Sequence, residues 1–283
     1  MLSNLLCIAA VLVGTWNLKW FPSGRAEHRA APEVENAAIA SVAAEIGGRL
    51  AKRGGAGAVV FLEEVRGEQV VGTLLEKIGD TNLHVAVVSA FRDFDGRLGW
   101  QQIAILTDLP VVESRYSYWK RTRKTLPPRG YAFALLDGGK EGLIACYGVH
   151  LKSNYGANSP EVRETNRLKR EMCTQQLVME TKRIKSPDGR QAKRIVVAGD
   201  FNFDPWNSRF KGERTIAELE EAGFVGCFAG VAPEERATHP GRGTWASSTL
   251  DFIFVRGMAG RGTPDLSPFI EASDHRAVWW TVK

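Results

Sequence analysis

Cysteine is scarce in this chain, and its spacing excludes two kinds of small domain. The chain has four cysteines, Cys7, Cys146, Cys173 and Cys227, and no two of them form a Cys-x-x-Cys pair. Zinc ribbons need such pairs, and disulfide-stabilised scaffolds need a much higher cysteine density. Because Cys146 lies in an apolar stretch that resembles a strand, we expect a buried free thiol there.

Long apolar runs are absent as well, so no segment qualifies as a transmembrane helix. The longest candidate covers residues 5–13, and no Lys or Arg precedes Lys19 as a signal peptide would require. This run can be the apolar part of a secretory signal or a buried first strand that continues into Asn17, and both interpretations stay open. We expect a cytoplasmic location in preference to secretion.

Internal repeats and long low-complexity segments are also missing, which excludes a solenoid and a disordered linker. The chain has 283 residues, of which 44% are hydrophobic and 24% are charged, a composition typical of a globular protein with a sizeable core. Lys and Arg exceed Asp and Glu by 37 to 32. The resulting net charge of +5 favours an anionic partner.

The hydrophobic pattern predicts helices and short buried strands, in an order that mixes helix-linked and hairpin connections. Such an order favours mixed sheets with helices outside, hence an α/β fold. We expect a single domain over residues 1–283, with a core at about residues 11–282, because the candidate site residues are spread along the whole chain. The predicted helices are 32–52, 67–78, 160–185 and 215–222, and the predicted strands are 58–62, 83–89, 101–107, 111–118, 131–136, 143–150, 195–198, 250–255 and 277–282.

Polar, acidic or imidazole groups flank six of the apolar runs. A carboxylate is costly to bury unless it is paired with a cation or binds a metal. Six such groups next to buried strands therefore indicate one shared site. They are Trp16-Asn17, Glu63-Glu64-Val65, His150-Leu151-Lys152-Ser153, Gly199-Asp200-Phe201-Asn202, Leu250-Asp251 and Ser273-Asp274-His275.

This set of residue types suits the hydrolysis of a phosphodiester. Glu64 is the first candidate for a Mg²⁺ ligand, because Mg²⁺ prefers carboxylate oxygens, water and phosphate. His275 suits a general base for the attacking water, since the pKa of histidine is ordinarily near neutrality, and Asp251 can orient it. The alternative is a buried pair with no catalytic role.

Other residues of the set have predicted roles around the phosphate. Asp200 and Asn202 lie two apart on an extended segment and point the same way, so Asp200 can position the water while Asn202 donates to phosphate oxygens. His150 can donate to a non-bridging oxygen or protonate the leaving group. Asn17 can order the metal ligands, and Asp274 can bind the metal directly or through water.

The ordered motifs resemble those of the endonuclease/exonuclease/phosphatase superfamily, the group of deoxyribonuclease I. The resemblance implies a four-layer α/β sandwich, in which two packed mixed β-sheets are flanked by helices. It further implies phosphoester cleavage that depends on Mg²⁺, with Mn²⁺ as the alternative, and Glu64 on the metal. Members differ in whether the aspartate of Gly-Asp-x-Asn or the terminal histidine is the base, so Asp200 and His275 both stay candidates, with His275 favoured.

Two positions depart from the usual pattern of the superfamily. Gln commonly precedes the metal-binding Glu, but this chain has Glu63 there, and strand alternation predicts that Glu63 and Glu64 face opposite sides, so that only one is a ligand. Abasic-site endonucleases commonly carry a Tyr-x-Pro-Asn-like motif where this chain has His150. The histidine is more similar to the deoxyribonuclease I and phospholipase-type branches, which disfavours abasic-site repair.

The segment from 115 to 129 carries six basic residues, three aromatic residues and no acid. Basic side chains neutralise phosphates and aromatic rings stack on bases, so this composition predicts a DNA-binding segment, with a solvated charged loop as the alternative. Arg129 can also reach the scissile phosphate, and Trp206 and Trp245 are candidates for the rim of a groove. The predicted substrate contacts are Arg115, Lys120, Arg121, Arg123, Arg129, Lys152 and Asn154.

The sequence therefore predicts a metal-dependent DNA endonuclease of low sequence specificity, acting as a monomer. Fold and metal do not fix the substrate, so two alternatives stay open. One is a phosphodiesterase or phosphatase of the sphingomyelinase or inositol-phosphatase type, which acts on a lipid-linked or small phosphoester. The other is a non-catalytic binding module on the same scaffold, which is disfavoured because the full polar set is present.

Overall fold

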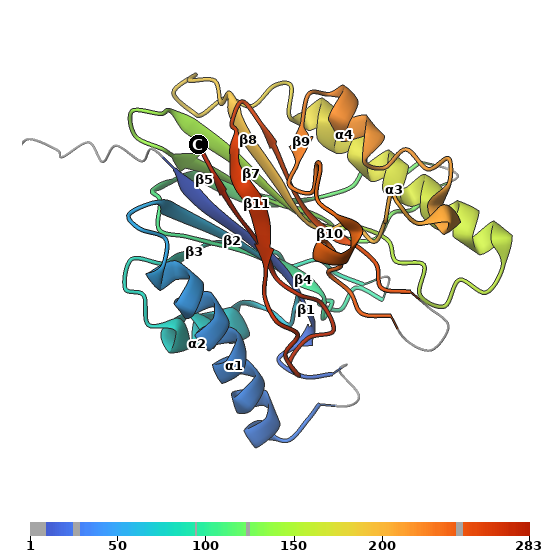
Figure 1. Ribbon diagram of the computed structural model, residues 1–283, viewed down its shortest axis with the longest axis horizontal. Coiled ribbons are helices and arrows are strands. Elements are labelled where there is room, and N and C mark those ends of the chain that lie inside the picture. Colours follow the sequence, from blue (N-terminus) through green and yellow to red (C-terminus); the bar gives the residue numbers. More distant parts are fainter. Residues whose placement is uncertain (1–9, 25–28, 94, 123–124, 242–245) are drawn as a thin grey trace, which may run out of the picture.

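The computed structural model places two six-stranded β-sheets face to face, with helices on both outer faces (Figure 1). These four layers confirm the predicted α/β sandwich of two packed mixed sheets. No helix in the described part of the chain is long and apolar enough to cross a membrane. The structure describes residues 10–24, 29–93, 95–122, 125–241 and 246–283.

The first sheet has the strand order β11-β12-β1-β2-β4-β3. Its only parallel pair within the described residues is β1 with β2, and the chain passes between these strands through α1 (Pro32–Ala51). The helix α2 (Glu68–Ile78) lies beside α1 on the same outer face (Figure 1). The strands are β1 (Val11–Phe21), β2 (Gly57–Val65), β3 (His84–Val88), β4 (Gln102–Thr107), β11 (Gly260–Leu266) and β12 (Val278–Val282).

The second sheet has the strand order β5-β6-β7-β8-β10-β9. Here β7 and β8 are the parallel pair, and α3 (Pro160–Glu180) connects them across the outer face. The short helix α4 (Ala217–Glu221) covers the same face (Figure 1). The strands are β5 (Val111–Tyr118), β6 (Gly130–Asp137), β7 (Leu143–His150), β8 (Arg194–Asp200), β9 (Val225–Gly226) and β10 (Asp251–Arg256), and two short 3₁₀ helices cover Ser208–Phe210 and Pro233–Glu235.

The strand β2 shows why the central strands read as continuous apolar runs. Val59 and Phe61 on one of its faces belong to the core between the sheets, whereas Val60 and Leu62 on the other pack beneath α1 and α2. A strand that is buried on both faces needs no polar alternation. The same double burial places the polar groups of these strands at the strand ends, where the apolar environment stops.

Several element boundaries differ from the sequence prediction. The helix predicted to reach residue 185 ends at Glu180, because the backbone N–H groups of Lys182 and Arg183 turn back to carbonyls three residues earlier and Ile184 leaves the helix to enter the core. The strand β11 was not predicted. Its Gly-Arg-Gly-Thr-Pro-Asp-Leu sequence disfavours a strand, but as an edge strand it needs a partner on one side only.

The structure describes the end of the N-terminal apolar run and three of the four cysteines. The first strand begins at Val11, so the end of the apolar run is strand, whereas residues 1–9, which include Cys7, lie outside the described residues. Cys146, Cys173 and Cys227 are free and buried. The expected free thiol at Cys146 is therefore confirmed.

Candidate active site

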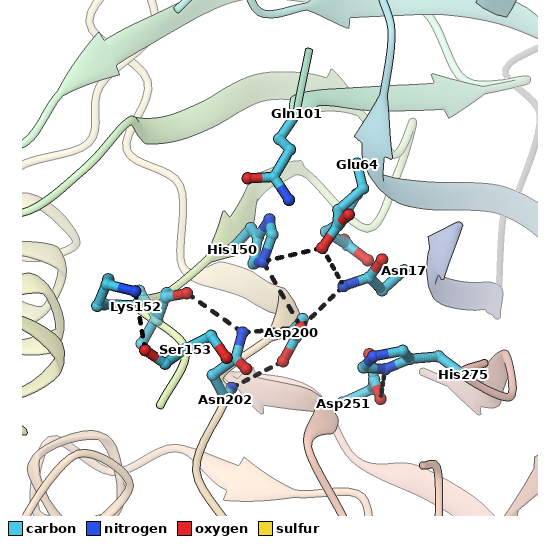
Figure 2. A network of polar contacts seen from close by, with 12 residues as sticks. Asn17, Glu64, Gln101, His150, Lys152, Ser153, Asp200, Asn202, Asp251 and His275 are labelled. Carbon is cyan, nitrogen blue, oxygen red and sulfur yellow. Dashed lines mark hydrogen bonds and ion pairs between the residues drawn. The ribbon is translucent and has the colours of Figure 1, made fainter. Parts of the chain in front are cut away.

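Strand register brings polar residues from distant parts of the chain to one edge of each sheet. In the second sheet His150 of β7 lies opposite Asp200 of β8, which in turn lies opposite Asp251 of β10. In the first sheet Asn17 of β1 lies opposite Glu63 of β2. Residues in register are neighbours in space. Both edges meet at the same end of the sandwich, where the polar network of Figure 2 lies.

Asn17 joins the two sheets. Its side-chain amide donates to Asp200 Oδ2 over 2.8 Å and to Glu64 Oε1 over 3.2 Å (Figure 2). Its Oδ1 accepts the backbone N–H of Lys19 over 2.9 Å. Asn17 is 1% exposed, so its polar atoms depend on these partners. One amide nitrogen therefore holds a carboxylate from each sheet.

The backbone at Glu64 leaves the regular strand conformation. Its φ is 59°, and the pairing of β2 with β4 shifts register between Glu63 and Val65. Glu63 accepts a hydrogen bond from Thr15, and Glu64 accepts one from Asn17, two residues further along β1 and on the same face. The expectation that the two glutamates face opposite sides is therefore wrong, because the irregular backbone brings both carboxyl groups to the interior between the sheets.

The two glutamates have different environments. Glu63 is fully buried, and burial together with the carboxylates of Asp251 and Asp200 raises its pKa well above the usual range. Its side chain therefore favours the neutral acid. The side chain of Glu64 is 12% exposed, and its Oε2 accepts the backbone N–H of Trp20 over 3.1 Å. Of the two, Glu64 is the carboxylate that an incoming cation can reach.

Non-glycine residues with a left-handed backbone gather around this network. In the described part of the chain they are Lys19, Trp20, Glu64, Arg129 and Asn202. Each such residue costs about 1–3 kcal/mol unless its surroundings hold it. The backbone N–H groups of Trp20 and Asn202 bind the carboxylates of Glu64 and Asp200, respectively. The strained positions thus coincide with the proposed site.

His275 and Asp251 form a buried pair beside Asp200. The Nδ1 of His275 lies 2.8 Å from Asp251 Oδ2 (Figure 2). The segment that carries His275 is fastened to β1 twice: Ser273 Oγ donates to the carbonyl of Asn17 over 2.6 Å, and Trp16 Nε1 donates to the carbonyl of His275 over 2.9 Å. These bonds fix where the imidazole stands.

The charges of this pair depend on the surrounding carboxylates. Burial alone lowers the pKa of His275, but Asp251, followed by Asp200 and Asp274, outweighs burial and raises this pKa to about 10. Burial and Asp251 raise the pKa of Asp200 to about 7, although His275 and the amide of Asn17 oppose the shift. The protonated imidazole therefore balances negative charge in the metal-free protein. A cation bound nearby would take over that balance.

His150 differs from His275 in its charge state. Burial and the nearby guanidinium of Arg129 lower the pKa of His150 well below its ordinary value, so its ring is neutral near pH 7. Its Nε2 lies 3.6 Å from Glu64 Oε1 and 3.7 Å from Asp200 Oδ2, which is too far for a hydrogen bond. The ring thus faces both carboxylates across a gap.

Gln101 is a site residue that sequence reasoning missed. Its Oε1 accepts a hydrogen bond from Arg129 Nη1 over 2.7 Å, and its NH₂ group points toward His150 and Glu64 (Figure 2). Gln101 immediately precedes β4, and no motif marks it. The polar pair Gln101-Gln102 in front of an apolar strand is the one signal that could have identified it.

Arg129 contacts Gln101 and the backbone at His150. Its Nη2 donates to the carbonyl oxygens of His150 over 3.3 Å and Leu151 over 3.4 Å. Burial lowers the pKa of Arg129, and the charge of Glu64 opposes that shift. Arg129 therefore lies beside the site with both of its terminal nitrogens bonded to protein acceptors, and its contact with the scissile phosphate stays a prediction.

Asn202 and Asp200 contact each other. The backbone N–H of Asn202 donates to Asp200 Oδ1 over 2.7 Å, and its amide donates to Asp200 Oδ2 over 2.9 Å. The amide also reaches the carbonyl of Leu151 over 3.2 Å. Asp200 Oδ2 therefore accepts from Asn17 and Asn202 together, and both amides border the gap in front of His150 (Figure 2).

Asp274 lies at the rim of the site next to two residues that sequence reasoning also missed. Its carboxylate pairs with Lys19 over 2.9 Å. Burial raises the pKa of Asp274, but Lys19, followed by the charge of His275, outweighs burial and lowers this pKa. The ring of His239 meets that of His275 edge to face, with centroids 4.9 Å apart. Ligand atoms of His239, Asp274 and His275 lie within 4.8 Å of one another. No sequence motif marks Lys19 or His239.

The predicted substrate contacts after His150 lie on the loop toward α3. Lys152 Nζ donates to the carbonyl of Ser153 over 2.9 Å, and burial followed by the charge of Arg129 lowers the pKa of Lys152. Asn154 Oδ1 accepts a hydrogen bond from Arg170 over 3.3 Å. Both residues therefore support the loop next to the site.

The side chains of the basic segment from 115 to 129 have different surroundings. Arg115 pairs with Glu113 and Glu180, and it lies over the ring of Phe133, so its guanidinium is engaged away from the acidic network. The side chains of Lys120 and Arg121 are exposed, and Arg123 lies outside the described residues. Of the two predicted rim tryptophans, Trp206 is 46% exposed and Trp245 lies outside the described residues.

The donor set fits a hard divalent cation. Carboxylate oxygens dominate the site, and ligand atoms of Asp200, Asp251 and His275 lie within 4.8 Å of one another. Glu64 faces the same gap and has no cationic side chain of Lys or Arg bonded to it in the described residues. Mg²⁺ and Mn²⁺ prefer oxygen ligands of this kind.

Comparisons with known proteins identify the family and the fold of the chain. The sequence matches the model of the Endonuclease/Exonuclease/phosphatase family over residues 14–275, and comparison with curated protein sequences gives no match. D. rerio TDP2, solved with a single-strand DNA product, is 15% identical, with a TM-score of 0.61 over 97% of this chain and 99% of that one.

Two bacterial structures are similar to the same degree. A family protein from Leptotrichia buccalis C-1013-b is 15% identical, with a TM-score of 0.64 over 96% of this chain and 98% of that one. The 3'-5' exonuclease from Neisseria meningitidis is 16% identical, with a TM-score of 0.61 over 96% and 98% of the two chains. At these identities the structures establish the shared fold.

Proposed function

The chain belongs to the endonuclease/exonuclease/phosphatase family, whose members are hydrolases of phosphoester bonds, and we propose that it is a divalent-metal-dependent nuclease that cleaves DNA with little sequence preference. One observation carries this proposal. Asn17 holds Glu64 and Asp200 together across the two sheets, and the His275–Asp251 pair lies directly beside them. An acidic pocket with an oriented imidazole suits cleavage of an anionic ester.

Glu64 is the proposed metal ligand, and Asn17 keeps its carboxylate in position. Enzymes of this family generally depend on a divalent metal. When bound, Mg²⁺ neutralises phosphate charge and polarises the phosphorus–oxygen bonds. Asp274 is a second candidate ligand, although its pairing with Lys19 means that it must exchange one partner for another.

The His275–Asp251 pair is proposed to activate the attacking water. Asp251 accepts the Nδ1–H of His275, which leaves Nε2 available to accept a proton from water once the ring is neutral. Asp200 is the alternative base, because its carboxylate lies beside the same pair and its pKa is raised to about 7, near the working pH of an enzyme.

Neutral donors around the gap are proposed to bind the phosphate oxygens. Gln101 and the neutral imidazole of His150 border this gap (Figure 2). Asn202 borders it too, but its amide already donates to Asp200 and to the carbonyl of Leu151, so a phosphate oxygen would have to replace one of these acceptors. Neutral donors suit a transition state whose negative charge grows on those oxygens, because they are already oriented in a buried site. Protonation of the leaving oxygen would instead need the imidazolium form of His150, which its lowered pKa disfavours.

Charge and relatives support DNA as the substrate. The chain has a net charge of +5 even though acidic residues are concentrated at the site, so the remaining surface is more basic than the total. Lys120 and Arg121 are exposed on the basic segment. The D. rerio relative was solved with single-strand DNA, and the Neisseria relative is a 3'-5' exonuclease.

A panel of substrates tests the proposal. Purified protein is incubated with plasmid DNA, single-stranded DNA, sphingomyelin or an inositol phosphate, with Mg²⁺ or with EDTA. We expect cleavage of DNA only with Mg²⁺. Turnover of sphingomyelin or inositol phosphate without DNA cleavage would assign the protein to the small-phosphoester branch, and no turnover of any substrate would favour a binding module.

A further inference from the structure

A pocket with a volume of about 310 Å³ extends from the active site toward the loops before β4 and after β5. Three of its lining residues lie at the acidic network. The backbone N–H of Trp20 donates to Glu64 over 3.1 Å, and the guanidinium of Arg129 donates to Gln101, which also lines the pocket. A molecule in the pocket therefore lies next to the carboxylate that is proposed to hold the cation.

Aromatic side chains form much of the pocket wall. Trp20, Phe91, Trp100, Tyr118 and Trp119 all line it. Phe91 and Trp119 are buried, whereas Tyr118 is 45% exposed and Trp20 and Trp100 are partly exposed. The ring of Tyr118 packs edge to face on Phe91, with centroids 5.2 Å apart. These rings offer flat apolar surfaces in a preformed arrangement, which suits a flat ring system.

Arginines give the pocket a positive charge. Arg92, Arg121 and Arg129 line it, and Asp93 is the one acidic residue among the described lining residues. A choline headgroup binds well to aromatic faces, but its positive charge would be repelled by these guanidinium groups. An inositol phosphate is anionic, but it has no flat ring to stack. A nucleotide combines the anionic group with the flat ring.

Two lining side chains carry a buried N–H group without an acceptor in the described part of the chain. They are Trp119 Nε1 and Arg129 Nε, and Trp119 is 3% exposed. A buried donor without an acceptor is unfavourable. Both nitrogens have less than 1 Å² of exposed surface, so a base in the pocket contacts the aromatic faces and the guanidinium groups around them instead of these N–H groups.

We infer that this pocket binds an unpaired nucleobase of the nucleotide next to the cleaved phosphate, and that it makes unpaired DNA the preferred substrate. The inference rests on the proposed function, because the position of the phosphate comes from it. A base enclosed by aromatic walls cannot remain paired in a duplex, and extruding it from a duplex costs free energy that a single strand is spared.

Binding of two oligonucleotides in EDTA tests the inference without cleavage. One single strand carries ordinary bases, and the other has the same length with a base-free tetrahydrofuran residue at every position, so their backbone charges are equal. Stacking on an aromatic side chain strengthens binding by roughly 5- to 150-fold per base. We expect fluorescence anisotropy to show that the wild type prefers the base-containing strand by at least about tenfold.

Variants assign this preference to the pocket. Trp100→Ala and Tyr118→Ala are expected to lose most of the preference, and Trp100→Phe, which keeps a ring, is expected to retain part of it. Tyr118 is exposed, so its replacement tests the pocket even if Trp100→Ala does not fold. Phe269→Ala is the matched control, because Phe269 is 48% exposed and packs against Arg276 instead of the pocket.

The outcomes separate this inference from the proposed function. Equal affinity of the wild type for the two strands would overturn the inference, and so would a preference that survives in both alanine variants. A duplex that binds as tightly as the base-containing single strand would overturn the preference for unpaired DNA. If the wild type prefers the base-containing strand but does not cleave DNA with Mg²⁺, the inferred base-binding pocket stands and the proposed nuclease activity is wrong.

Discussion

Asn17 Nδ2 lies 2.8 Å from Asp200 Oδ2, and this hydrogen bond connects the first sheet to the second at the centre of the site. The same amide contacts Glu64 on the neighbouring strand. Two carboxyl groups thus share one neutral donor, so much of their negative charge stays available to a divalent cation. The bond links the packing of the sandwich to the proposed metal site.

Replacing this shared donor should weaken both the fold and the activity. Asn17→Ala leaves Asp200 short of a buried donor, which lowers the free energy of unfolding by about 1–3 kcal/mol. Urea denaturation measures this loss, and turnover should fall in parallel. Asn82→Ala, in an exposed turn, is the matched control. A variant at position 17 as stable and active as the wild type would show that the bond matters little.

His275 and Asp251 should act as one unit. His275→Ala and Asp251→Asn are each expected to lower kcat by ~10²–10⁴-fold, because loss of a general base or of the group that orients it has effects of this size. The double variant should be no slower than the slower single variant. The measurement is kcat at saturating DNA and Mg²⁺. Losses that multiply would show that the two residues act independently.

The adjacent glutamates should respond differently to the same substitution. Glu63→Gln keeps a neutral side chain where the structure favours one, so turnover should stay close to that of the wild type. Glu64→Gln removes the charge of the proposed metal ligand and should lower turnover by at least ~10²-fold at low Mg²⁺. Initial rates over a Mg²⁺ series decide between them. If Glu63→Gln lowered turnover more than Glu64→Gln, the metal ligand would be Glu63 instead.

The metal-free protein should lose stability as the pH rises. The pKa of His275 is raised in the fold from 6.5 to about 10, so its contribution is fully present below pH 6.5 and is lost as the pH rises through about 10. The raised pKa values of Asp200 and Glu63 act in the same direction. Thermal unfolding in EDTA should show this fall, and His275→Gln should flatten it. A melting temperature that rises with pH across this window would contradict the charge assignment.

The exposed basic side chains should set the salt dependence of DNA binding. Replacing Lys120 and Arg121 together by Ala should reduce the slope of log affinity against log salt by about 1.4 for single-stranded DNA, or roughly 0.7 per phosphate contact. Arg190→Ala is the control. Arg190 pairs with Asp188 and Asp137, and Asp137 is the last residue of β6, whereas Arg129 precedes the first residue of that strand. An unchanged slope would show that Lys120 and Arg121 do not contact phosphates and that the segment is a solvated charged loop.

Much of the fold and of the acidic network could be predicted from the sequence, because both follow from buried strands that end in polar groups. His150, Asp200 and Asp251 stand at such strand ends, and sheet register then places them side by side. Glu64 and His275 are marked by the same pattern. Short-range sequence order was therefore enough to find these residues, although they lie far apart in the chain.

The rest depended on backbone geometry that local patterns do not encode. Side chains alternate between the two faces of a regular strand, which predicted opposite faces for the two glutamates. The left-handed φ at Glu64 interrupts this alternation. Gln101 lies at the site with its amide oxygen hydrogen-bonded to Arg129, and His239 lies there on a loop with its ring against that of His275. Arg115 shows the opposite case, since charge density suggested a substrate contact and the fold pairs it with Glu180.

The proposed metal dependence is measured by the initial rate of DNA hydrolysis by EDTA-treated wild type as Mg²⁺ is added back. We expect no cleavage at the start, and a rate that rises and saturates with Mg²⁺. Cleavage that persists in EDTA, or a protein that stays inactive on DNA at saturating Mg²⁺, would contradict a metal-dependent nuclease built on this site.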